Sequence, residues 1–214
     1  MNGFEFICEA LSIKRGELDA ILALTKNSEV EWLEFKAAIK PKDKVETVDV
    51  NEADFIFNLV KALISMSNGS GGLVVLGVDD DGKAIGLESS GYAGDRDKFT
   101  RYISDKVFFK EGWRTQSSGH WRWKDPTDQL SFDPQWAKLQ GLDVLVFPVK
   151  PRDPEVGPLV LTKAKSKKEN PKEVILIRAG GDRGNIVSLT AEDACNWWPK
   201  RNLEIFDSKF KSWI

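Results

Sequence analysis

The chain has 214 residues, 41% of them hydrophobic, which is enough apolar sequence for a single α/β domain with a full core. Its charged residues are nearly balanced, with 31 basic against 33 acidic, and the formal net charge is −2. This balance argues against a disordered tail and against a wholly basic nucleic-acid coat, so any nucleic-acid surface must be a local patch.

Targeting signals and cysteine content indicate the cellular compartment of the protein. No apolar run approaches the roughly 20 residues that a membrane span needs. No basic residue precedes Lys14, so the N-terminus lacks the charged start of a secretory signal. Two cysteines and one histidine are too few for a disulfide framework or a cysteine–histidine zinc cage. We expect a soluble, cytoplasmic protein with no membrane contact.

Four segments have the apolar spacing that is typical of helices. They are residues 12–24, a helix that opens at Asn51 or Asp54 and ends at Asn68-Gly69, residues 97–109, and a helix that opens at Thr190-Ala191-Glu192-Asp193. The last of these has acids in its first turn, where the helix dipole favours them.

Strand patterns fall between the helices. Strands are predicted at 29–36, at 73–76 with a turn at 79–82 and a return strand at 83–87, and at 142–149, 159–164 and 173–178. Residues 113–141 hold four of the eight tryptophans and show no helical period, so we interpret them as an irregular insertion with one short strand at 120–124. The predicted fold is α/β (α+β): a single domain over 1–214, with its core at about 29–193 and a mixed, mostly antiparallel sheet flanked by helices.

The strongest chemical signal is the segment Glu29-Val30-Glu31-Trp32-Leu33-Glu34-Phe35-Lys36. Side chains alternate between the two faces of a strand, so Glu34 and Lys36 would share one face while the apolar residues beside them point to the other. The segment therefore predicts a core face and a working face on one strand.

Further acids follow the buried run at 73–76. The side chain of Asp79 or Asp80 could lie close to those of Glu29 and Glu34. Oxygen ligands suit Mg²⁺ or Mn²⁺, and Lys36 would steady the attacking water or the phosphate. This set favours metal-assisted phosphodiester cleavage. The structural alternatives are a solvated strand edge, an ordinary ion pair and a plain hairpin turn. If the acids do crowd together, replacing Glu34 by Gln should leave the fold intact and slightly raise the melting temperature.

A group of cations near the C-terminus could track a phosphate backbone, although a solvated charged loop has the same composition. Its members are Lys163, Lys165, Lys167, Lys168, Lys172, Arg178 and Arg183. Trp121, Trp123 and Trp136 could stack unpaired bases, but packing in the core is the more common role of tryptophan.

The order of these segments resembles the Schlafen-type AlbA-like domain. The resembling residues are Glu29-x4-Glu34-Phe35-Lys36, Ser67-Asn68-Gly69 with Gly71-Gly72, Gly77-Val78-Asp79-Asp80, Ile85-Gly86-Leu87 and Ile175-Leu176-Ile177-Arg178-Ala179-Gly180. The resemblance implies a metal-dependent endoribonuclease, using Mg²⁺ or Mn²⁺, that cuts structured or single-stranded RNA of the transfer or ribosomal class in a toxic or antiviral role.

Carried over residue by residue, the family's two glutamates fall on Glu29 and Glu34. Its aspartate falls on Asp79 or Asp80, of which we favour Asp80. The alternative is a non-catalytic regulatory module that binds DNA or RNA. Cleaving members in animals clamp RNA between two such lobes, so a chain with length for one lobe implies a homodimer or a fused partner domain. The chain is also expected to be the N-terminal part of a longer protein.

Overall fold

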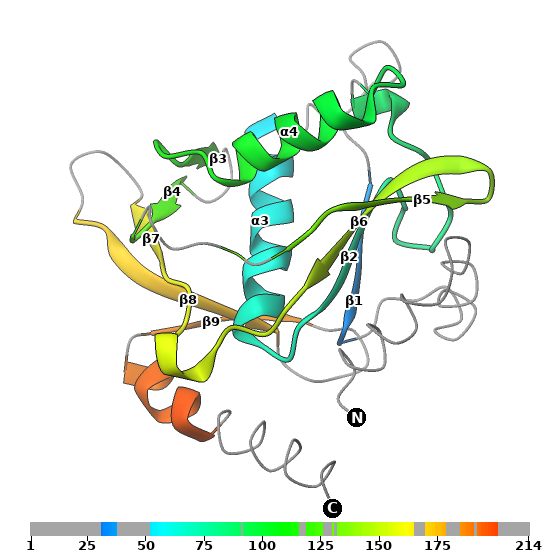
Figure 1. Ribbon diagram of the computed structural model, residues 1–214. Coiled ribbons are helices and arrows are strands. Elements are labelled where there is room, and N and C mark those ends of the chain that lie inside the picture. Colours follow the sequence, from blue (N-terminus) through cyan, green and yellow to red (C-terminus); the bar gives the residue numbers. More distant parts are fainter. Residues whose placement is uncertain are drawn as a thin grey trace, which may run out of the picture.

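The computed structural model describes residues 31–37, 52–90, 92–115, 119–125, 130, 132–164, 170–178, 185–190 and 192–200 (Figure 1). Within these residues the helices are α3 (Glu52–Asn68), α4 (Arg96–Val107) and one over 192–200, with 3₁₀ turns at Glu88–Ser90 and Pro154–Val156. The strands are β1 (Leu33–Lys36), β2 (Gly72–Leu76), β3 (Trp113–Thr115), β4 (Gly119–Trp123), β5 (Gln135–Leu139), β6 (Leu142–Val149), β7 (Leu161–Ala164), β8 (Lys172–Arg178) and β9 (Ile186–Leu189). No helix in the described part has both the length and the hydropathy of a membrane span.

The strands form two sheets. The first has the order β1-β2-β6-β5, in which β1 runs parallel to β2 and the other pairs are antiparallel. The second has the order β3-β4-β7-β8-β9 and is antiparallel throughout. The predicted α+β class is confirmed, with the strands divided between one mixed sheet and one antiparallel sheet.

Helix α3 packs against both sheets (Figure 1). Its buried side chains join one core cluster with Val74, Leu76 and Phe147 of the first sheet and with the tryptophans of β3 and β4. Complete burial of a leucine or phenylalanine stabilises the fold by about 1.5–3 kcal/mol, so this cluster holds the helix and the two sheets together.

The first sheet has a second apolar cluster on its opposite face. Leu33 and Phe35 of β1 belong to it, together with Leu73, Val75 and Val146. Because side chains alternate along a strand, Glu34 and Lys36 point the other way, toward the side of the sheet on which α3 packs. The predicted apolar face of β1 is confirmed, whereas the face that carries Glu34, predicted as a working face, is also largely buried.

The turn from α3 into β2 sets the position of β1. Gly72 has φ +155°, and a Cβ added there would lie 2.6 Å from the carbonyl oxygen of Trp32. Asn68, fully buried at the end of α3, donates from Nδ2 to the carbonyls of Leu159 (3.0 Å) and Leu176 (2.9 Å). Its Oδ1 accepts from the Leu159 N–H at 2.7 Å. One side chain thus ties the end of α3 to β8 and to the segment before β7.

Most of the predicted elements in the described residues are confirmed. Helices α3 and α4 and strands β2, β6, β7 and β8 lie where the sequence predicts them, and the helix over 192–200 follows Thr190, whose Oγ1 accepts from the Asp193 N–H at 3.2 Å. Helix α3 ends at Asn68, where the sequence predicts its end, and the glycine with left-handed backbone that follows is Gly71 (φ 80°). The predicted helix at 12–24 lies outside the described residues.

Other expectations were wrong in whole or in part. The strand predicted at 29–36 begins only at Leu33, because residues 31 and 32 form a turn. Residues 113–141 contain three strands where one was predicted: β4 confirms the predicted strand at 120–124, whereas β3 and β5 lie where irregular chain was expected. The return strand at 83–87 is reduced to a single bridge between Val78 and Ala84. Strand β9, which the sequence did not predict, pairs with β8.

Candidate functional site

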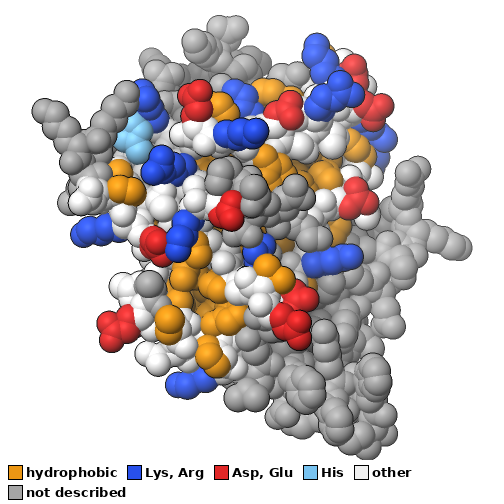
Figure 2. Space-filling view, turned by 60° about the vertical axis from the view of Figure 1, so that its left-hand side comes forward, with side chains coloured by type: hydrophobic (Ala, Val, Ile, Leu, Met, Phe, Trp, Pro, Cys, Tyr) orange, Lys and Arg blue, Asp and Glu red, His pale blue; other side chains and the backbone are white. Residues whose placement is uncertain are grey.

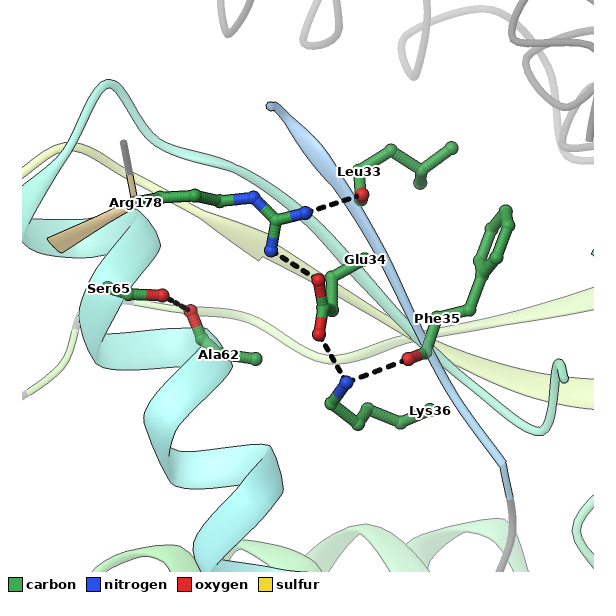
Figure 3. A network of polar contacts seen from close by, with 7 residues as sticks. All are labelled: Leu33, Glu34, Phe35, Lys36, Ala62, Ser65 and Arg178. Carbon is green, nitrogen blue, oxygen red and sulfur yellow. Dashed lines mark hydrogen bonds and ion pairs between the residues drawn. The ribbon is translucent and has the colours of Figure 1, made fainter. Parts of the chain in front are cut away.

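Glu34 lies at the junction of the two sheets, with 8% of its surface exposed. Lys36 Nζ donates to Glu34 Oε1, and Arg178 Nη1 donates to Glu34 Oε2 (Figure 3). Arg178 Nη2 also donates to the carbonyl of Leu33 at 3.1 Å. The guanidinium therefore ties β1 of the first sheet to the end of β8 in the second, a charge-assisted contact across 144 residues of sequence.

The parallel pairing of β1 with β2 explains why this face is enclosed. Glu34 is opposite Val74 and Lys36 is opposite Leu76, and both apolar partners pack against α3. Figure 3 shows Ala62 and Ser65 of α3 on the same side of β1 as the carboxylate of Glu34. The carboxylate of Glu34 therefore lies on the α3 side of the sheet, whereas the side chain of Lys36 remains 20% exposed.

Lys61 of α3 adds a further positive charge to this region. It is partly buried, and its pKa lies below the ordinary value, chiefly because of burial and then because of the positive charge of Lys36; the charge of Glu34 opposes the shift. Its Nζ lies 5.7 Å from the centre of the Phe57 ring. We call Lys36, Lys61 and Arg178, together with Glu34, the cationic centre.

Lys61 belongs to none of the predicted motifs. The available signal was that Lys61 is the only charged residue between positions 55 and 68, in a helix whose other side chains are largely apolar. A charge that must lie near the core of a helix–sheet packing is unusual unless it has a partner or a function.

Arg178 was expected on a basic surface. Its side chain is only 2% exposed, whereas that of Lys36 is 20% exposed. The structure therefore places Arg178 behind Glu34, where it can orient the carboxylate. Lys36 and Lys61 are the members of the centre that a ligand could reach.

The two predicted aspartates lie in the turn after β2. Asp79 Oδ1 accepts hydrogen bonds from the backbone N–H groups of Asp81 (3.1 Å) and Lys83 (2.8 Å), so this oxygen stabilises the turn. Asp80 is exposed. Glu29, the remaining predicted acid, lies outside the described residues.

The described acids do not fit a divalent metal ion in this arrangement. Both oxygens of Glu34 are held by cations, and Asp79 Oδ1 is held by the backbone. Among the residues described, no three His, Cys, Asp or Glu side chains are grouped so that they could hold an ion. The charges around Glu34 are positive, which reverses the expectation that Glu34→Gln would relieve repulsion.

The two other predicted cations that the structure describes, Lys163 and Lys172, lie away from this centre, toward the opposite end of β8 from Arg178. Lys163 lies over Trp121, with Nζ 4.8 Å from the ring centre, and it is opposite the exposed Lys172 in the pairing of β7 with β8. Trp121 and Trp123 are buried, whereas Trp136 is partly buried and donates from Nε1 to Thr100 Oγ1 at 3.0 Å. Three lysines of the predicted loop (165, 167 and 168) and Arg183 lie outside the described residues.

Sequence comparison identifies the family of the chain. The family profile described as Schlafen, AlbA_2 matches residues 29–186, well over half of the sequence. The chain belongs to the Schlafen AlbA_2 family. The matched region contains Glu34, Lys36, Lys61 and Arg178, and the family is one associated with nucleic acids. No curated protein sequence matches the chain.

Two solved structures resemble this Schlafen AlbA_2 domain in fold. The DIP2311 protein from Corynebacterium diphtheriae aligns at 16% identity with a TM-score of 0.43, over 74% of this chain and 22% of its own. The N-terminal domain of a RecG-related protein from Nitrosomonas europaea aligns at 20% identity with a TM-score of 0.40, over 83% of this chain and 94% of its own. The chain thus matches about a fifth of the length of the Corynebacterium protein.

Proposed function

We propose that this Schlafen AlbA_2 domain binds nucleic acid, RNA in preference to DNA, by receiving a backbone phosphate at Lys36 and Lys61. The observation that carries the proposal is the excess of positive charge at the cationic centre, where Lys36 and Arg178 both contact the one carboxylate of Glu34 and Lys61 lies within the electrostatic influence of Lys36 and Glu34. The preference for RNA rests on the family resemblance alone.

The lowered pKa of Lys61 supports this proposal. Lys36 and Lys61 repel one another, and Glu34 is already engaged by Lys36 and Arg178. A phosphate oxygen placed between the two lysines would offset this repulsion and replace the water lost on burial. Binding should therefore raise the pKa of Lys61, and affinity should fall as the pH rises through its value in the free protein.

The test is the affinity for a fluorescein-labelled single-stranded RNA, measured by anisotropy over a salt series. Lys36→Gln and Lys61→Gln should each weaken binding by roughly tenfold, the loss of one charge-assisted hydrogen bond of about 1.5 kcal/mol. Each should also reduce the slope of log K against log salt by about 0.7. Lys110→Gln, which removes an exposed lysine beyond α4, is the matched control. Equal affinities for the wild type and all three variants would refute the proposal.

The second candidate function is metal-dependent cleavage of RNA with Mg²⁺ or Mn²⁺, with Glu29, Glu34 and Asp79 or Asp80 as the acid set. This candidate rests on the family resemblance, and binding of the ion would require Glu34 to exchange its contact with Lys36 for the metal. A toxic or antiviral role would follow from cleavage of cellular transfer or ribosomal RNA.

A cleavage panel separates the two candidates. Transfer RNA, ribosomal RNA and single-stranded and duplex DNA are incubated with the protein in Mg²⁺, Mn²⁺ or chelator, at a temperature where every variant is folded. A nuclease should cut in metal but not in chelator, and Glu29→Gln should lower the rate by at least ~10²-fold without preventing RNA binding. If the protein binds RNA but cleaves none of these substrates, nuclease activity is excluded and nucleic-acid binding remains as the proposed function.

A further inference from the structure

Strands β3 and β4 alternate tryptophan with cationic or titratable side chains. Trp113, Trp121 and Trp123 are 3%, 6% and 5% exposed, because they point into the core against α3. The side chains between them must point to the other face of the sheet. Arg114 and Arg122 are exposed there, and His120 is partly exposed.

The strand register brings these three side chains together. Arg114 is directly opposite His120 in the antiparallel pairing of β3 with β4. Directly opposed residues have Cβ atoms about 4.5–5.5 Å apart, and His120 and Arg122 are two residues apart in one strand, about 6.8 Å. Figure 2 shows Lys and Arg side chains on either side of the single histidine. We call Arg114, His120 and Arg122 the outer basic strip.

Acidic side chains do not neutralise this strip within the described residues. Neither of its arginines forms an ion pair there, and Arg122 Nε donates to the neutral Thr162 Oγ1 at 3.2 Å. The register places Glu173 two strands from Arg122, but that carboxylate is held by Lys124 at 2.9 Å. The local positive charge is therefore a property of this face, since the whole chain has a net charge of −2.

The outer basic strip is separate from the cationic centre. Along β8, Ile175 and Ile177 form an apolar cluster with Ala194 of the helix over 192–200, whereas Leu176 joins the main core. Arg178 follows Ile177 and so shares the inner face with Leu176. The strip lies on the outer face, and the helix over 192–200 covers the part of that face formed by β8.

We infer that the outer basic strip is a second RNA-contacting surface, which holds the phosphate backbone of a single strand outside the cationic centre. Arginine presents a planar fork of donors that matches phosphate, and two arginines on one flat sheet face can contact neighbouring phosphates. The three tryptophans of these strands point inward, so base stacking on them is not available. Binding here should therefore be tolerant of base sequence.

This inference rests on the proposed nucleic-acid function, and one binding experiment tests both separately. The variant Arg114→Gln/Arg122→Gln is compared with Lys98→Gln/Arg101→Gln, which removes two exposed cations from α4. Both are titrated with short single-stranded RNAs of two unrelated sequences over a salt series. Loss of two phosphate contacts should lower the salt slope by about 1.4 for both sequences, while the α4 variant keeps the wild-type slope.

The outcomes that overturn the inference are distinct. If wild type binds RNA and only the variants of Lys36 and Lys61 lose affinity, the strip makes no contact and the cationic centre acts alone. An equal loss in the α4 variant would show a general charge effect. Competition by polyglutamate as strong as that by RNA would assign the strip to an acidic protein partner. Failure of wild type to bind any RNA would remove both proposals. Arg114→Gln alone, with a wild-type melting curve, keeps the test valid if the double variant is unstable.

Discussion

Replacing Glu34 by Gln should destabilise the domain, because the carboxylate is the anionic partner of a buried guanidinium. Arg178 has a side chain only 2% exposed and would be left without a charge to offset its burial. Removing one partner of a buried ion pair costs about 3–5 kcal/mol. Glutamine keeps one acceptor for Arg178, so we expect about 3 kcal/mol, equivalent to a fall in melting temperature of roughly 6–12 °C for a chain of this size.

Urea denaturation followed by circular dichroism measures this cost. Glu173→Gln is the matched control, because Glu173 also pairs with a lysine but both side chains are about half exposed, at 43% and 50%. A surface pair of this kind should contribute under about 1 kcal/mol. A double-mutant cycle of Glu34→Gln with Arg178→Met then isolates the pair, with an expected coupling energy of about 1–3 kcal/mol.

The reasoning fails if Glu34→Gln unfolds within about 0.5 kcal/mol of wild type, or if its effect adds to that of Arg178→Met without coupling. Either result would mean that the carboxylate does not hold the guanidinium in solution. The same measurement separates structure from chemistry, since any loss of cleavage by Glu34→Gln must be recorded where the variant is still folded.

Three other predictions follow from the same contacts. Lys61→Met should raise the free energy of unfolding near neutral pH, because burial and the charge of Lys36 disfavour the charged form of this lysine in the folded protein. Since the folded-state pKa of Lys61 is lowered, the unfolded chain binds more protons and wild-type stability rises with pH through that window, so the gain should shrink as the pH rises. Trp121→Ala should lower the free energy of unfolding by about 3–5 kcal/mol in urea denaturation and change RNA affinity much less. The reason is that Trp121 packs in the core, with its ring centre 4.7 Å from that of Phe57. A larger effect on affinity than on stability would assign Trp121 to base stacking. Replacing Lys165, Lys167 and Lys168 by Glu should lower the salt slope of RNA binding by roughly one unit per lost contact, and an unchanged slope would exclude that loop from the interface.

Local patterns in the sequence were sufficient to predict many of the helices and strands. Apolar residues three and four apart predict α3 and α4, and the alternation around Glu34 predicts which side of β1 faces the core. These properties depend on a few contiguous residues and on the fixed periods of helices and strands. The strand at Gly119–Trp123 was likewise predicted, at 120–124, whereas Trp113–Thr115 has only three residues and is too short to show a period.

The partners of Glu34 were decided only by the tertiary structure. The sequence correctly placed Lys36 beside it, because two residues in one strand share a face. It could not show that Arg178, 144 residues away, would reach the same carboxylate. Nor could it show that Lys61 would lie near Lys36 and Glu34. Those contacts arise where β1, α3 and β8 meet, and the pairing of two sheets across one helix is a non-local choice that no local period encodes. The chain itself therefore determined which residues are available for chemistry, and the packing of its sheets determined the charge that surrounds them.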